Sequence, residues 1–169
     1  MAKAEVQNLV FVFMLALLVI GLVMIFGFKA ISDLMVKSTE ADFIRFKTAL
    51  ERDIGAISTE AGSSELLDLK LPVGYNQMCF VDDDLIGSPS PPANLNPIIK
   101  NSISSGIQKN IFLIKSRASA ESFYVGKINI PDPDPTDSAN PLFLCTDTSS
   151  GRVAFRITGR GNYVEISES

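Results

Sequence analysis

The chain has 169 residues and a formal net charge of -4, with 15 lysine and arginine residues against 19 aspartate and glutamate residues. This balance provides no broad basic surface for a phosphate backbone, so we expect no nucleic-acid partner. Histidine is absent, which removes Ser-His-Asp and Cys-His catalysis and the commonest zinc ligand. Ser-Lys catalysis stays formally open, but spacing singles out no such pair. We therefore expect no enzyme, no cofactor and no metal site.

An apolar segment without charge, residues 9–28, follows a short N-terminal tail, residues 1–8. Twenty residues at a helical rise of about 1.5 Å extend roughly 30 Å, the thickness of a hydrocarbon core. We predict a single-pass transmembrane helix, with the lipid bilayer as its partner. A cleaved signal peptide is the first alternative, although its apolar core is usually shorter and no small-x-small cleavage site precedes Lys29. A buried core helix is the second, and it needs more covering protein than the remaining chain supplies.

Residues 29–61 continue with a helical period and predict a juxtamembrane amphipathic helix. Its apolar positions recur at steps of three and four residues, namely Ile31, Leu34, Met35, Phe43, Phe46, Leu50, Ile54 and Ile57. No proline occurs before Pro72, so both segments are compatible with one helix that ends near Gly62. The apolar stripe is expected to pack on the chain's own C-terminal domain, on helices of other copies, or on both in succession.

Residues 62–169 predict a small antiparallel β-rich head with one short helix, so the expected fold class of the whole chain is α+β. Alternation of apolar and polar residues predicts a strand at 67–71, and a second strand is expected at 77–81. Asn96 and Pro97 mark the start of a short helix that ends near Gly106. The remaining apolar runs predict further strands at 111–114, 123–130, 142–145, 153–157 and 163–166. Turn residues favour a hairpin at 149–151 and a bend or second hairpin at 159–162.

Two acidic clusters offer the hard oxygen atoms that calcium prefers. One is the run Asp82, Asp83 and Asp84, and the other is the sparser set Asp132, Asp134 and Asp137. Neither has the ligand spacing and glycine of a helix-loop-helix calcium site. Solvated loop aspartates are therefore the preferred interpretation, and calcium binding is the alternative.

The only two cysteines, Cys79 and Cys145, both lie in predicted strands. Outside the cytoplasm, a pair on neighbouring strands would form a disulfide that closes a loop of about 65 residues, worth up to roughly 4 kcal/mol in the loop-entropy model. The alternative is two reduced cysteines that act as small apolar core residues. We favour the disulfide.

The charges beside the apolar segment bear on its orientation. Lys3 and the α-amino group lie before it, whereas Lys29, Lys37, Arg45 and Lys47 follow it, which by the positive-inside rule favours a cytoplasmic head. The short tail, the interspersed acidic residues and the expected disulfide favour the opposite orientation. We predict a single-pass membrane protein with an extracytoplasmic head.

The order of short tail, apolar segment, amphipathic helix and β-rich head resembles the type IV pilin-like proteins, especially archaeal ones. Lys3, Ala4 and Glu5 look like the processing junction of that family, which implies a cut after Ala4. Counted from Glu5, the fifth residue is Leu9, where many members carry glutamate.

The resemblance implies a filament or pseudopilus subunit at the cell surface, with copies of itself or pilin-like proteins as partners. The face expected to serve in the membrane and in assembly consists of Val10, Phe13, Leu17, Ile20, Met24 and Phe28. The alternative is a single-pass binding or scaffold module that does not polymerise and requires no cleavage.

Overall fold

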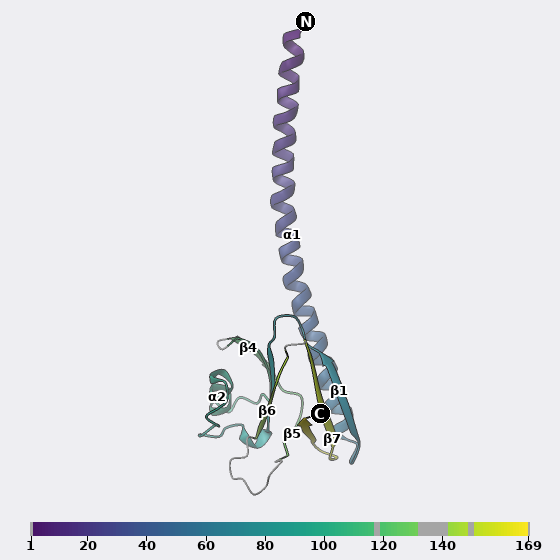
Figure 1. The fold of residues 1–169 in the computed structure, drawn as a ribbon, viewed down its shortest axis with the longest axis vertical. Helices are drawn as coiled ribbons and strands as arrows, with labels where there is room; N and C mark the ends of the chain where they lie inside the picture. Colours follow the sequence, from purple (N-terminus) through teal and green to yellow (C-terminus); the bar gives the residue numbers. More distant parts are fainter. Residues whose placement is uncertain (1, 117–118, 132–141, 149–150, 169) are drawn as a thin grey trace. The chain divides into compact units, whose positions relative to one another are not determined.

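The computed structural model describes residues 2–116, 119–131, 142–148 and 151–168. It divides into two compact units, Met1–Ala41 and Asp42–Ser169, and we call the second the globular unit. In chain order the elements are α1 (Ala2–Ser58), β1 (Ser64–Lys70), β2 (Gln77–Val81), the 3₁₀ helix η1 (Asp83–Leu85), α2 (Pro97–Ser104), β3 (Ile111–Ser116), β4 (Ser119–Phe123), β5 (Ile128–Asn129), β6 (Phe143–Asp147), β7 (Arg152–Gly159) and β8 (Val164–Glu168) (Figure 1). A long N-terminal helix followed by antiparallel-rich sheets and a short α-helix confirms the α+β prediction.

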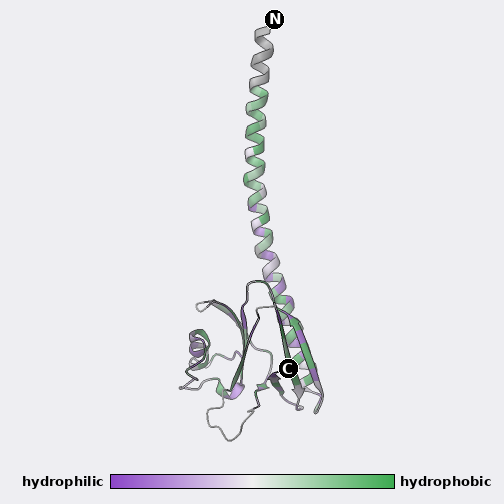
Figure 2. Ribbon diagram, viewed as in Figure 1, coloured by the Kyte–Doolittle hydropathy of each residue, from purple (hydrophilic) through white to green (hydrophobic). Residues whose placement is uncertain are grey.

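Helix α1 includes all of the apolar segment and most of the amphipathic segment. After the N-terminal tail its residues are mostly hydrophobic, whereas later residues include both hydrophobic and hydrophilic ones (Figure 2). No proline interrupts it, as the sequence indicated. The chain then turns: Glu60 N donates to Ile57 O at 3.0 Å, and Gly62 has a φ of +86°, a left-handed conformation that favours glycine.

The strands of the described residues form two four-stranded sheets. Sheet 1 has the order β1-β7-β8-β5, and sheet 2 has the order β4-β3-β2-β6. All neighbouring strands are antiparallel except β5 and β8, which pair in parallel through Ile128 with Val164 and Asn129 with Glu165. The expectation of antiparallel strands is therefore right for most of the head, and the two-residue strand β5 is the exception.

Two hydrophobic clusters stabilise the globular unit. The larger lies between the inner faces of the sheets and includes the α1 residues Phe46, Leu50, Ile54 and Ile57. Within it, the rings of Phe80 from sheet 2 and Phe155 from sheet 1 have centroids 4.7 Å apart. The smaller cluster packs α2 on the outer face of sheet 2, and its members are Cys79, Val81, Leu85, Leu95, Ile99, Ile103, Phe112 and Ile114.

Two predictions of local structure are wrong. The apolar run 123–130 does not form one strand, because β4 ends at Phe123 and β5 starts only at Ile128, with Gly126 between them at a φ of +105°. The pattern of apolar and polar residues along 123–130 does not mark this break. The turn around residues 149–151 is not a hairpin, since β6 belongs to sheet 2 and β7 to sheet 1. Residues 149 and 150 themselves lie outside the described ranges. The hairpin at 159–162 is confirmed, because β7 and β8 pair antiparallel.

Gly159 joins the end of β7 to the turn after α1. Its N donates to Ser63 O at 2.8 Å, and its O accepts from Gly62 N at 2.8 Å. A Cβ atom at this position would overlap the carbonyl oxygens of Ile57 and Glu60. Only glycine therefore allows the last turn of α1 to lie this close to sheet 1.

Candidate functional site

The apolar segment of α1 is the first candidate site, because none of its large side chains from Phe11 to Phe28 is covered. From Phe11 to Phe28 every large hydrophobic residue is 47–75% exposed. Among the described residues, α1 is the one helix long and apolar enough to cross a membrane. Exposing apolar surface to water costs about 25 cal/mol per Å², so a continuous exposed segment of this kind is unstable in water. It requires lipid or other protein around it.

Exposure does not distinguish the predicted assembly residues from their neighbours. Phe13, Leu17, Ile20, Met24 and Phe28 are exposed, and so are the large hydrophobic residues between them. Val10 and the junction residues Lys3, Ala4 and Glu5 lie within the bounds of α1. The whole surface of this segment, rather than one face, is therefore available for contact.

The amphipathic stripe of α1 divides into two parts. Ile31, Leu34 and Met35, in the first unit, are 57–73% exposed. From Phe46 onward, the stripe residues are buried in the core of the globular unit. Phe43 is half-buried, and its ring contacts those of Tyr75 and Phe123 at centroid distances of 6.3 and 5.9 Å. The stripe thus packs on the chain's own domain only from about Phe43 onward.

A disulfide joins Cys79 and Cys145, as the sequence predicted. The two residues are directly opposite in the pairing of β2 with β6. Cys79 is fully buried, and Cys145 is partly buried. The bond fixes the edge strand β6 to the interior strand β2, which β3 flanks on its other side. A disulfide of this kind fits an oxidising, extracytoplasmic environment.

The run Asp82–Asp84 supports local structure. Asp82 is 1% exposed. Its Oδ1 accepts from Asp84 N at 2.8 Å, and its Oδ2 accepts from Asn129 Nδ2 at 2.9 Å and from Ile130 N at 2.8 Å. Burial raises the pKa of this carboxyl above its usual value, and the backbone hydrogen bonds partly oppose the shift. Asp82 thereby fixes the start of η1 and the end of β5.

Asp83 links the same turn to the segment between β4 and β5. Its Oδ1 accepts from Asn110 Nδ2 at 3.0 Å, and its Oδ2 accepts from the Tyr124 hydroxyl at 2.9 Å. Burial of the phenol, together with this hydrogen bond to the carboxylate, raises the pKa of Tyr124 to about 12. Asn110 is buried and also donates to Gly126 O at 2.7 Å. Both carboxylates are therefore engaged by protein donors.

The calcium alternative gains no support from this geometry. Within the described ranges, no group of three or more acidic, histidine or cysteine side chains is arranged to hold a metal ion. The second cluster, Asp132, Asp134 and Asp137, lies outside the described residues.

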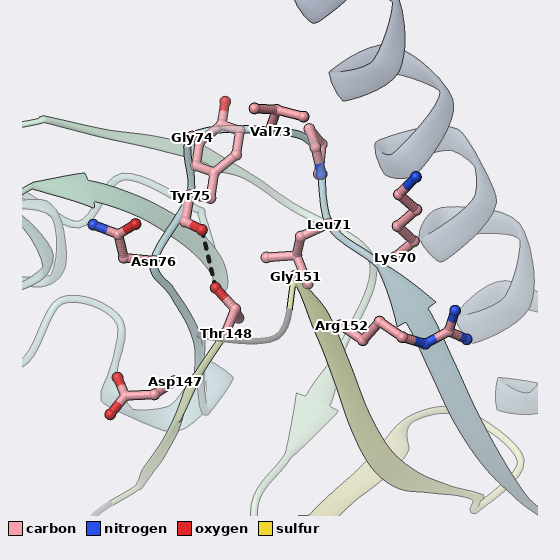
Figure 3. Close-up of a pocket in the computed structure, with 11 residues that line it drawn as sticks. Lys70, Leu71, Val73, Gly74, Tyr75, Asn76, Asp147, Thr148, Gly151 and Arg152 are labelled. Atoms are coloured by element: carbon pink, nitrogen blue, oxygen red, sulfur yellow. Dashed lines mark hydrogen bonds between the residues drawn. The ribbon is translucent and has the colours of Figure 1, made fainter.

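A surface hollow of about 840 Å³ lies where the β1–β2 connection meets the start of β7 (Figure 3). Thr148 Oγ1 donates to Tyr75 O at 3.0 Å across it. The side chains of Lys70 and Arg152 point to one side, away from Asp147 and Asn76, which point to the other (Figure 3). Arg152 forms a bidentate pair with Asp68, which lowers the pKa of Asp68 through the hydrogen bond. Among the described residues that line this hollow, no acid, base and nucleophile converge.

No protein-family model, curated protein or solved structure matches this chain. The functional argument therefore depends on the sequence pattern and on the geometry of the described residues.

Sequence reasoning found the apolar segment and the cysteine pair but missed the structural role of the aspartates. The run of three acidic residues gives no sign that two of them are satisfied by Asn110, Tyr124 and Asn129, which are distant in sequence. The one available signal was the helix-cap chemistry of Asp82 before a short turn.

Proposed function

We propose that this chain is a membrane-anchored, pilin-like structural subunit with an extracytoplasmic head. The main support is the division of α1: its apolar side chains are exposed from Phe11 to Met35, and then the same helix enters the core of the globular unit. A subunit that inserts in lipid and later packs against its neighbours requires this division. The disulfide on sheet 2 supports the extracytoplasmic orientation.

The physical reason for assembly is the exposed area of the apolar segment. When a subunit leaves the bilayer, these side chains must be buried again, and lateral packing among helices buries them at about 25 cal/mol per Å². Processing after Ala4 would give the mature subunit an N-terminus at Glu5, directly before the segment. Copies of this chain or pilin-like proteins are the partners in this proposal. Its role is structural rather than enzymatic.

A second candidate is a single-pass binding or scaffold module that does not polymerise. Leu9 favours it, since many pilin-like proteins carry glutamate at the corresponding fifth position of the processed chain. In this alternative the apolar segment stays in lipid and residues 1–4 are retained.

Immunogold electron microscopy of cells that express the tagged full chain separates the two candidates. The tag follows Ser169, at the end of the globular unit. We expect label along surface filaments and protease access to the head in intact cells. Replacement Leu17→Asp should abolish labelled filaments, whereas the exposed polar control Ser38→Asp should keep them. Label confined to the membrane in cells with the unmodified chain would instead support the non-polymerising module.

A further inference from the structure

A second hollow, next to the one in Figure 3, is lined by an unusual set of polar side chains. Its volume is about 530 Å³. We call it the amide hollow, because four of its lining residues carry carboxamides: Asn76, Gln77, Asn94 and Asn96. Asp147 adds a carboxylate, and Asn76 and Asp147 both point away from the first hollow, toward the same side (Figure 3).

Three elements, β2, β6 and α2, place these groups. Asn76 and Gln77 lie at the start of β2, Asp147 at the end of β6, and Asn96 at the cap of α2. Leu95 and Ile114 lie beneath them in the smaller core cluster, so a packed base holds the connection before α2 against sheet 2. Lys100 Nζ donates to Ala93 O at 2.6 Å and further fixes this connection.

Hydrogen bonds within the protein orient the amides and use only part of their capacity. Asn76 Nδ2 donates to Lys115 O at 3.1 Å, and Gln77 Nε2 donates to Asp147 Oδ1 at 3.1 Å. The amide oxygens of both residues are thereby left as acceptors. Asn96 does the reverse: its Oδ1 accepts from Ile98 N at 2.9 Å, which leaves its amide N–H groups as donors. The hollow therefore offers fixed acceptors and fixed donors side by side.

The described residues that line this hollow carry few charges, and those charges have partners within the protein. Lys115 Nζ lies 3.5 Å from Glu121 and 4.8 Å from the centroid of the Tyr75 ring, so its ammonium group already has partners. Among the described lining residues Asp147 is the other charged group, and it accepts from Gln77. Among the described residues that line the hollow, Lys115 is the one cation and it is already engaged, so they offer a strongly anionic ligand no available cation. The side chains of Leu95 and Ile114 are buried beneath the polar groups.

We propose that the amide hollow binds a neutral carbohydrate through its hydroxyl groups. Each sugar hydroxyl is both a donor and an acceptor, and neighbouring hydroxyls match the mixed set that Asn76, Gln77, Asn96 and Asp147 present. An extended peptide is a poorer match, because β2 is an interior strand between β3 and β6 and its backbone groups are already paired. This inference does not depend on whether the chain forms filaments.

Saturation-transfer difference NMR on the full chain in lipid nanodiscs tests the proposal. Nanodiscs replace maltoside detergents, whose sugar head groups would compete. The probes are neutral hexose and N-acetylhexosamine oligosaccharides, their sulfated counterparts, and a polar peptide. We expect saturation transfer to at least one neutral oligosaccharide, reduced at least tenfold by the double replacement Asn94→Ala and Asp147→Ala.

The control is Asn101→Ala, an exposed asparagine on α2 that does not line the hollow, and it should bind as the unmodified chain does. Asn94 is an exposed residue on the connection before α2 and Asp147 lies at a strand end, so far-UV circular dichroism should show that the double variant folds. The proposal is overturned if no neutral oligosaccharide binds, if the double variant retains binding, if the control loses it equally, or if the sulfated sugars or the peptide bind more tightly.

Discussion

Removal of the disulfide should measurably destabilise the globular unit. Cys79 and Cys145 are 66 residues apart, and closing a loop of that length restricts the unfolded chain by about 4 kcal/mol in the loop-entropy model. Measured losses for native disulfides are commonly about 2–5 kcal/mol. Because β6 is an edge strand held to sheet 2 by one neighbour, its attachment should weaken first. We therefore expect the double replacement Cys79→Ala and Cys145→Ala to lower the unfolding free energy by about 2–4 kcal/mol.

Tyrosine fluorescence during guanidinium unfolding is a suitable assay. The chain has no tryptophan, and all three tyrosines, Tyr75, Tyr124 and Tyr163, belong to the globular unit. The signal therefore reports on that unit without interference from the apolar segment. Reductant should shift the unmodified protein toward the double variant and leave the double variant unchanged. Equal stability of the unmodified protein with and without reductant would refute the reasoning.

The core and the turns give four further predictions. Leu50→Ala should cost about 2–5 kcal/mol in the same unfolding assay because Leu50 is fully buried, whereas Leu34→Ala, at a side chain 73% exposed, should cost little. Asp82→Ala leaves the buried N–H of Ile130 without its acceptor and should lower the free energy of unfolding by about 1–3 kcal/mol. Loss of the exposed Asp84 carboxylate should lower it much less. Burial raises the pKa of the Asp82 carboxyl, so the native state binds the carboxyl proton more tightly than the unfolded chain does. The contribution of the protonated carboxyl to stability therefore falls as pH rises above 3.8, the ordinary value. Carboxyl ¹³C shifts should show Asp82 titrating above that value. Gly159→Ala should disrupt the junction of β7 with α1 and reduce the yield of folded protein, and normal stability would contradict the close approach.

The elements with strong local signals were predictable from the sequence. The length of the apolar segment and its lack of charged residues predicted α1. The Asn96-Pro97 pair located the start of α2, where Asn96 Oδ1 accepts from Ile98 N. The alternation of apolar and polar residues located β1, and β2 and β7 were also predicted close to their observed bounds. These features depend on neighbours in sequence, which one chain displays directly.

The arrangement of strands in two sheets was not predictable, because it depends on pairings between distant residues. The parallel contact of β5 with β8 joins residues 128–129 to 164–165, and nothing local encodes it. The amide hollow was missed for the same reason, since Asn76, Asn96 and Asp147 come together only through the packing of α2 and β6 around β2. The asparagines are ordinary turn and cap residues when considered singly.

The most direct test of the proposed function is the intact mass and N-terminal peptide of the protein isolated from its native membrane without reductant. The account predicts loss of residues 1–4, a new N-terminus at Glu5, and a mass two hydrogens lower for the Cys79–Cys145 bond. A mature chain that retains Lys3 and Ala4 would contradict the pilin-like proposal and leave a membrane-anchored module. Free thiols at both cysteines would contradict the extracytoplasmic head.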